Sequence, residues 1–249
     1  MLRPKLKTVE KYIPPYPLNH FPNNVACDLA KEIVYLLATR MTPSLEGSDW
    51  EQIFSRIIQG RWKPSNVGLD DIVLEQTAWS AKTVKAISPS KAKKVRLISG
   101  RNSPSFSFGQ DAVFSQNPNM IGAMVLSIWN ERVAAIRSKY HHLRTTVLIK
   151  SEDLLELALF EHDTVLYNQD SFTWKWNKNH NIEGFNEDGE HKFTWQPHGA
   201  QFTIIEHVPD DRLAIIIKQP EQLSPKVVLE GLGFTQNWVR ILGMRSELL

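Results

Sequence analysis

Cysteine is almost absent from this sequence: Cys27 is the only one among 249 residues. A single cysteine cannot form a disulfide within the chain, and it excludes a zinc site built from several thiolates of one chain. A lone cysteine is typical of a reducing compartment, so we expect a cytoplasmic protein. No stretch approaches the roughly 18 apolar residues of a membrane-spanning helix, and the basic segment 1–7 lacks the apolar centre of a signal peptide.

A strong net charge is also missing, because 29 Lys and Arg stand against 27 Asp and Glu, for a net charge of +2. This balance does not by itself predict nucleic-acid binding, and the distribution of the charges matters more. Residues 82–101 contain no acid, and their basic members are Lys82, Lys85, Lys91, Lys93, Lys94, Arg96 and Arg101. Such a run fits either a solvated surface or a surface that binds phosphates.

Hydrophobic spacing predicts an α/β core over residues 25–160, preceded by an extended, proline-rich arm at residues 1–24. Apolar side chains at helical spacing predict a helix over 25–40, a second helix that starts at a Ser48-Asp49-Trp50-Glu51 capping box, and a long helix over about 120–140. The predicted strands of this part are a hairpin at 69–85 and the segments 94–99, 104–108 and 145–149. This order predicts a mixed central sheet flanked by helices.

Residues 161–249 have a different pattern and predict an antiparallel, β-rich region integrated with the core. The expected strands are 163–167, 171–176, 191–196, 201–206 and 212–217, and a short helix starts at Ser224-Pro225. Alternation places Phe172, Trp174 and Trp176 on one face of a strand, where we expect them in the core rather than stacked on nucleic-acid bases.

The hairpin carries the most informative residues of the chain. Asp71 opens an apolar strand, a short polar turn follows, and the second strand leads to Lys82. This layout places a carboxylate and an ammonium group on neighbouring strands. It resembles the active-site hairpin of the PD-(D/E)XK nucleases, with two departures: Leu69 or Asp70 replaces the usual proline, and Ser80 replaces the usual second acid.

The resemblance implies a magnesium site at this hairpin. It assigns Asp71 and the backbone carbonyl of Ala81 as ligands of Mg²⁺, and Lys82 as the group that activates the attacking water. Ser80 is a poor metal ligand, so a further acid is required. Helices before the hairpin often supply a glutamate in this family, and we therefore expect Glu32 to complete the site. Asp70 and Glu75 are the alternatives nearer in sequence.

Within this family the chain looks most like a small type II restriction endonuclease. The implied function is magnesium-dependent, sequence-specific cleavage of double-stranded DNA by a homodimer. Two polar segments outside the hairpin are the candidate DNA contacts. They contribute Arg101, Asn102 and Ser103 from one loop and Gln196, His198 and Gln201 from another, beside Lys85 on the hairpin. Glutamine amides can bind adenine edges.

Several other interpretations stay open. Asp71 could merely begin a strand, with Lys82 as an edge-strand charge. Ser80 favours a DNA-binding protein whose nuclease fold no longer cuts, and the aromatic β-rich region would also suit a carbohydrate- or protein-binding module. His141-His142 with His180 and Asn181 could belong to a ββα-metal nuclease, although residues 177–198 do not predict the required hairpin and helix.

Overall fold

The computed structural model describes residues 12–42, 44–63, 68–109 and 117–240. Residues 1–11 of the predicted arm therefore lie outside the described residues. The helices are α1 (Val25–Thr39), α2 (Gly47–Ile57), α3 (Pro104–Phe108), α4 (Pro118–Arg137) and α5 (Pro225–Gly231). The strands form two sheets and are β1 (Arg61–Trp62), β2 (Ile72–Leu74), β3 (Thr77–Lys85), β4 (Lys94–Arg101), β5 (His142–Lys150), β6 (Glu156–Asp163), β7 (Thr173–Trp176), β8 (Ile182–Phe185), β9 (His191–Gln196), β10 (Gln201–His207) and β11 (Leu213–Ile216).

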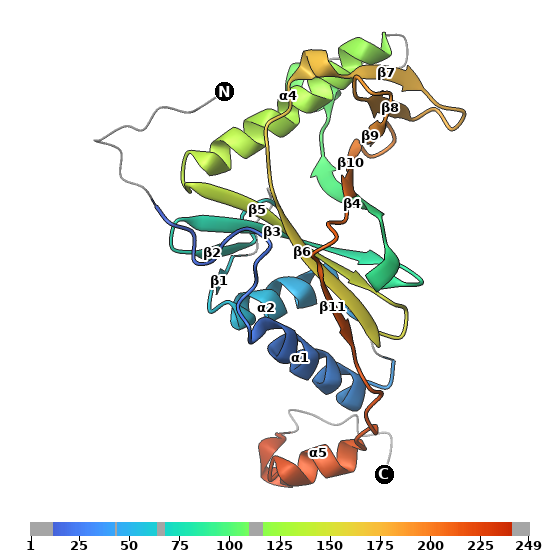
Figure 1. The fold of residues 1–249 in the computed structure, drawn as a ribbon. Helices are drawn as coiled ribbons and strands as arrows, with labels where there is room; N and C mark the ends of the chain where they lie inside the picture. The colour runs from blue at the N-terminus through green and yellow to red at the C-terminus, as the bar shows by residue number, and fades with distance from the viewer. Residues whose placement is uncertain (1–11, 43, 64–67, 110–116, 241–249) are drawn as a thin grey trace.

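The first sheet has the order β1-β2-β3-β5-β6-β11 and is mixed, because β3 and β5 run parallel while its other neighbouring strands are antiparallel. Helices α1 and α2 cover one of its faces (Figure 1). Successive side chains of a strand point to opposite faces. Trp79 and Ala81 accordingly pack with these helices, while Ala78 packs toward α4 on the other face. This alternation also directs Lys82 away from α1 and α2.

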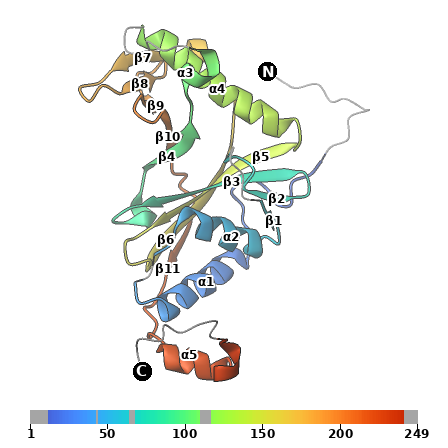
Figure 2. The same ribbon diagram turned by 180° about the vertical axis from the view of Figure 1, so that it is seen from behind.

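The second sheet is antiparallel, with the order β4-β10-β9-β8-β7, and it packs with α4 beside the first sheet (Figures 1 and 2). The contact between α4 and this sheet depends on Gly122. A Cβ atom at Gly122 would lie 2.2 Å from the Trp174 ring, so only glycine allows the two elements to approach this closely. Phe172, Trp174 and Trp176 all belong to this core cluster, as the alternation predicted.

The arm packs over the first sheet through its described residues. The Tyr16 hydroxyl donates to Glu161 at 2.6 Å, and the Asn19 side chain accepts from the Glu161 backbone N–H at 2.9 Å. Glu161 also accepts from Trp79 Nε1 at 2.7 Å and pairs with Arg144 at 3.2 Å. Burial of this ion pair is tolerated because additional hydrogen bonds satisfy it.

The mixed α/β class and most predicted elements are confirmed, including the helix over 25–40, the hairpin and the helix over 120–140. The predicted strand at 104–108 is wrong: Ser103 caps a helix there, accepting from the Phe106 N–H, and Pro104 occupies the first turn. The predicted strand at 163–167 is also wrong, since β6 ends at Asp163. The capping box of α2 starts earlier, at Glu46, which exchanges bonds with Asp49.

Candidate functional site: the open end of the β2–β3 hairpin

Asp71 lies at the open end of the hairpin, directly before β2. Only 3% of its surface is exposed, and its Oδ2 accepts the backbone N–H of Ala81 at 3.2 Å. Burial raises the pKa of Asp71 to about 6, against the opposing effect of the Lys82 charge. A buried carboxylate with one hydrogen bond retains free acceptor positions, and a cation could occupy them.

Lys82 lies across the hairpin on β3, on the face away from α1 and α2. Burial lowers the pKa of its ammonium, and the Asp71 charge partly opposes this shift. No direct ion pair joins Lys82 to Asp71 among the salt bridges of the described residues. The two charges are therefore electrostatically coupled but separated, which leaves room between them for another atom.

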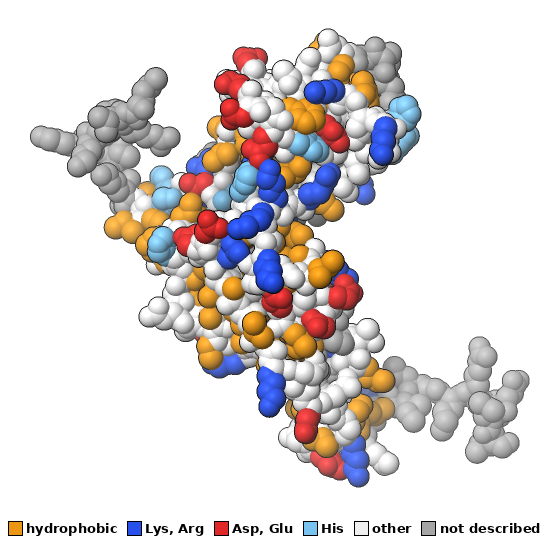
Figure 3. All heavy atoms as spheres, turned by 45° about the vertical axis from the view of Figure 1, so that its right-hand side comes forward, with side chains coloured by type: hydrophobic (Ala, Val, Ile, Leu, Met, Phe, Trp, Pro, Cys, Tyr) orange, Lys and Arg blue, Asp and Glu red, His pale blue; other side chains and the backbone are white. Residues whose placement is uncertain are grey.

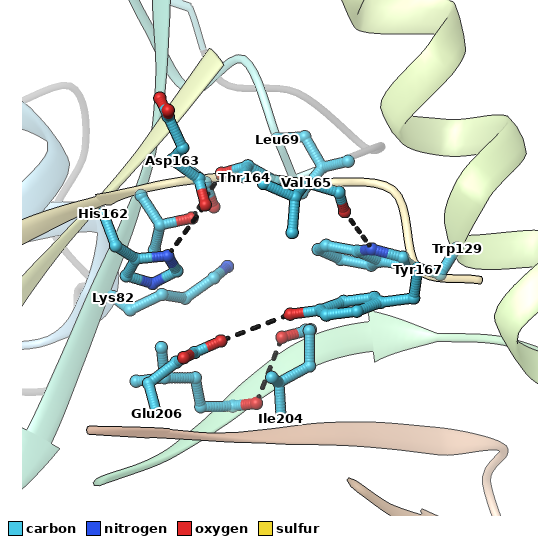
Figure 4. Close-up of a pocket in the computed structure, with 14 residues that line it drawn as sticks. Leu69, Lys82, Trp129, His162, Asp163, Thr164, Val165, Tyr167, Ile204 and Glu206 are labelled. Carbon is cyan, nitrogen blue, oxygen red and sulfur yellow. Dashed lines mark hydrogen bonds between the residues drawn. The ribbon is translucent and has the colours of Figure 1, made fainter. Parts of the chain in front are cut away.

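The Lys82 side chain lines a small cavity of about 10 Å³ between the two sheets. Figure 4 shows its ammonium pointing into the space bounded by His162, Tyr167 and Glu206. The Tyr167 hydroxyl donates to Glu206 at 3.3 Å, whereas the buried His162 Nε2 has no hydrogen-bond partner in the described part of the chain. A cavity of this size and polarity can hold about one water molecule.

Glu51 is the acid that the sequence interpretation missed. It projects from α2, and its Oε2 accepts Trp62 Nε1 at 3.0 Å. Its charge raises the pKa of both Asp71 and Lys82, so it lies within electrostatic reach of both groups. Two helices precede the hairpin, and α2 rather than α1 supplies the nearby glutamate. No local sequence pattern distinguishes Glu51 from the other acids of the two helices.

Arg132 brings a second cation to the site from α4. Its guanidinium donates to the Ser99 carbonyl at 2.7 Å and to Asn102 Oδ1 at 3.0 Å. Its charge lowers the pKa of Lys82, while Asp71 raises the pKa of Arg132 against the larger effect of burial. Gly100, at φ 106°, makes space for this guanidinium, because a Cβ there would lie 2.7 Å from its nitrogens.

Glu32, the acid expected to complete the site, is paired with an arginine of α2. Both of its carboxylate oxygens bind Arg56, at 3.1 and 2.7 Å, and Glu32 does not contribute to the pKa shift of Asp71. Among the alternatives, Asp70 is buried and pairs with Lys63 at 2.5 Å. Glu75 is exposed at the hairpin turn, about 13 Å along the strand from Asp71 at the usual rise per residue.

The donor set suits magnesium only in part. The Ser80 hydroxyl is buried and donates to the Gly68 carbonyl at 2.9 Å. No group of three or more His, Cys, Asp and Glu side chains that could hold a metal occurs in the described ranges. Mg²⁺ is often held by one or two carboxylates together with water and substrate phosphates, and Asp71 offers one buried carboxylate for such a site.

The candidate DNA contacts divide into two groups. β10 lies between β4 and β9, and Gln201 pairs with both Arg101 and Gln196, so these three residues share one end of the second sheet. The exposed His198 lies in the adjoining β9–β10 loop. Ser103 belongs to the same end but its hydroxyl caps α3. Lys85 lies on β3 of the first sheet, apart from this group, and pairs with Glu152 at 2.8 Å.

Asn102 is not available as a DNA contact, which corrects the prediction. It is fully buried, and its side chain donates to the Val125 carbonyl at 3.0 Å while accepting from Arg132. Its backbone carbonyl accepts Trp195 Nε1 at 2.7 Å. Asn102 thus fixes the position of Arg132 rather than contacting a ligand.

The acid-free basic run is partly neutralised by acids from distant segments. Lys85 pairs with Glu152, Lys93 with Asp210, and Lys94 with Glu190, at 2.8, 3.7 and 2.5 Å. Figure 3 shows Lys and Arg side chains over the middle of one face, interspersed with acidic groups. The run therefore gives a mixed surface rather than a uniformly positive one.

The histidine alternative finds no support in the described residues. His142 begins β5 of the first sheet, whereas His180 lies in the β7–β8 turn of the second sheet, where a strand and not a helix follows.

None of the helices in the described ranges is long and apolar enough to cross a membrane. Comparisons of the chain with protein-family models, curated proteins and solved structures give no match in any of the three, so the site is interpreted from its own geometry.

Proposed function

We propose that this protein is a magnesium-dependent endonuclease that cleaves double-stranded DNA at specific sequences. The observation that carries the proposal is the buried Asp71 carboxylate at the open end of one hairpin, with Lys82 on the neighbouring strand and the charges of Glu51 and Arg132 within electrostatic reach of Lys82. Two acids and two bases in a partly buried site are a costly arrangement for stability alone, and perturbed groups of this kind are concentrated at functional sites. The order of helix, hairpin, helix and parallel strand also fits the core of the nucleases that the hairpin resembles.

Each residue has a role that follows from its position. Asp71 and Glu51 would hold the metal, which supplies a Lewis acid and an activated water when bound. Lys82, with a lowered pKa, can accept a proton from that water or stabilise negative charge on the phosphate. Arg132 adds positive charge from α4. Lys82 and Arg132 together provide the counter-charge that a phosphodiester needs.

Sequence recognition would lie at the shared end of β4, β10 and β9. Arg101, Gln196 and Gln201 present one guanidinium and two amides side by side, with His198 in the adjoining loop. Arginine and glutamine are suited to guanine and adenine edges in the major groove. Arg132 links this end to the hairpin, because it binds Asn102, the residue that follows Arg101.

A plasmid digest tests the proposal. Supercoiled plasmids of known sequence are incubated with the protein and either magnesium or a chelator. Discrete linear fragments that require magnesium support a sequence-specific nuclease, and Asp71→Asn and Lys82→Ala should remove them. Asp28→Asn and Lys31→Ala, an exposed acid and base on α1, are the matched controls. A smear would retain cleavage but contradict specificity.

A second candidate function is DNA binding without cleavage. Two observations favour it: Ser80 is committed to the Gly68 carbonyl, and no three-residue metal group occurs in the described part of the chain. This candidate predicts salt-dependent DNA affinity with intact plasmid after incubation with magnesium. A gel-shift assay beside the digest separates the two functions.

A further inference from the structure

The chain leaves the first sheet after β11 and continues as residues 221–240, the C-terminal arm. Two hydrogen bonds hold its beginning to α1: the Leu223 N–H donates to the Ala38 carbonyl at 2.8 Å, and the Gln222 amide donates to the Arg40 carbonyl at 2.9 Å. Beyond them, α5 lies past the end of α1 and away from both sheets (Figures 1 and 2). Val228 is half-buried, and every other residue of the arm is exposed.

The C-terminal arm is rich in exposed apolar side chains. They are Leu223, Val227, Leu229, Leu232, Phe234, Trp238 and Val239, with Leu232 61% and Trp238 62% exposed. Phe234 and Trp238 pack edge to face at 5.7 Å and bury little else. Isolated helices need about 12–15 residues even to be marginal in water, and α5 has 7. Among the described residues, no surface of this copy covers the apolar side chains of the arm.

A second exposed apolar surface lies on the last turns of α1 and just beyond its end, next to the root of the arm. It consists of Val34, Tyr35 and Met41, which we call the α1 patch, with Tyr35 65% and Met41 88% exposed. The patch flanks Ala38 and Arg40, the two residues that hold the beginning of the arm. One chain thus presents a protruding apolar element and an apolar receiving surface side by side.

The charges of the C-terminal arm indicate what kind of partner it fits. Its only charged residues are Glu221, Lys226, Glu230 and Arg240, which balance. A nucleic acid or an anionic membrane would select an excess of basic residues, so neither suits the arm. Its twenty residues are close to the roughly 20–30 residues that each side contributes to a standard protein interface. The chemistry therefore favours a protein surface.

We propose that the C-terminal arm is a dimerisation element that packs on the α1 patch of a second copy of this chain. Because arm and patch adjoin, a two-fold axis near the arm root lets each arm cover the other copy's patch. Such an interface is isologous and closes at two copies. The proposal deepens the proposed function, since two copies place two hairpins on one duplex, but the association itself requires neither DNA nor metal.

Sedimentation equilibrium of the full chain, without DNA or magnesium, tests this inference over about 1 to 100 μM protein. We expect a dimer for the wild type and a monomer for Leu232→Glu/Trp238→Glu. Tyr35→Glu, on the receiving side, should weaken the dimer at least about tenfold. Ile98→Glu, which alters a side chain 57% exposed on β4, is the matched control and should remain dimeric. Thermal unfolding by circular dichroism verifies that each variant is folded.

Three results would overturn the proposal: a monomeric wild type, a dimer that survives the double substitution in the arm, or assembly that continues beyond two copies. A monomer that floats with phosphatidylserine vesicles would assign the arm to a lipid surface instead. The outcome is separable from the nuclease assay. A monomer that cleaves plasmid contradicts only the dimer interface, and an inactive dimer contradicts only the proposed function.

Discussion

The first sheet contains two buried clusters of charge that differ in how completely they are satisfied. On the face covered by α1 and α2, Glu161 accepts from Tyr16, Trp79 and Arg144, and Arg144 also donates to the Tyr16 carbonyl at 2.9 Å. On the hairpin, the Asp71 carboxylate has a single hydrogen bond, from the Ala81 N–H, and no direct ion pair with Lys82 among the described residues.

The comparison separates a structural cluster from a functional one. Buried charges contribute to a fold when every donor and acceptor is used, as around Glu161. Charged groups that lie near each other without direct pairing keep unused hydrogen-bond donors and acceptors, which a ligand can bind. The protein retains such groups at a cost in stability. Four predictions test this distinction, from the largest expected effect to the smallest.

The largest effect is expected at the satisfied cluster. Glu161→Gln leaves the buried Arg144 guanidinium without its counter-charge, which should lower the free energy of unfolding by about 3–5 kcal/mol. Urea denaturation monitored by tryptophan fluorescence measures this change. Glu152→Gln, at an exposed ion pair, is the control and should change stability by less than about 1 kcal/mol. A small effect at Glu161 would contradict the structural assignment.

Lys82→Ala should lower the rate of DNA cleavage rather than the free energy of unfolding. We expect DNA cleavage to fall by about 10²–10³-fold, because the group that receives the proton or stabilises charge is lost. DNA affinity should remain near that of the wild type, since other contacts supply it. Single-turnover plasmid cleavage and a parallel gel shift measure the two quantities. Cleavage by Lys82→Ala at the wild-type rate would show that the hairpin is not the active site.

Glu51→Gln should slow cleavage by about 10–100-fold and raise the magnesium concentration required, as expected for loss of a group that supports a metal site. Glu32→Gln is the informative comparison, because Glu32 binds Arg56 on the exposed side of α1 and α2. A magnesium titration of the cleavage rate distinguishes the two glutamates. Equal losses in both variants would restore the sequence-based assignment of Glu32.

Asp71→Asn should stabilise the metal-free protein by about 1–2 kcal/mol at pH 8. The pKa of Asp71 is raised from 3.8 to about 6 in the folded protein. The folded protein favours the protonated carboxyl, so the contribution of Asp71 to the free energy of unfolding is fully present below pH 3.8. This contribution is lost as the pH rises through about 6. The advantage of the asparagine variant should accordingly shrink between pH 8 and pH 5. Urea denaturation with a chelator present measures this trend, and a pH-independent difference would contradict it.

The sequence-based predictions for Glu32 and Asn102 missed the partners of these residues for the same reason. Glu32 and Glu51 both lie on helices before the hairpin, and Asn102 lies in a polar loop that resembles a ligand-binding segment. Only the packing shows that Arg56 binds Glu32, that Trp62 holds Glu51, and that Val125 and Arg132 enclose Asn102. These partners are separated by 11 to 30 positions in the chain, beyond the range of any local pattern.

Sequence alone determined most of the local elements of this protein. Helical spacing fixed α1 and α4, and strand alternation with a short polar turn fixed the hairpin that carries Asp71 and Lys82, because these features depend on neighbouring residues. The tertiary structure decided which acid and which base approach that hairpin, and which acids neutralise the basic run after Lys82. Those outcomes depend on side chains from α2, α4 and distant loops meeting in a partly buried space, where burial and long-range charge set the protonation of every group.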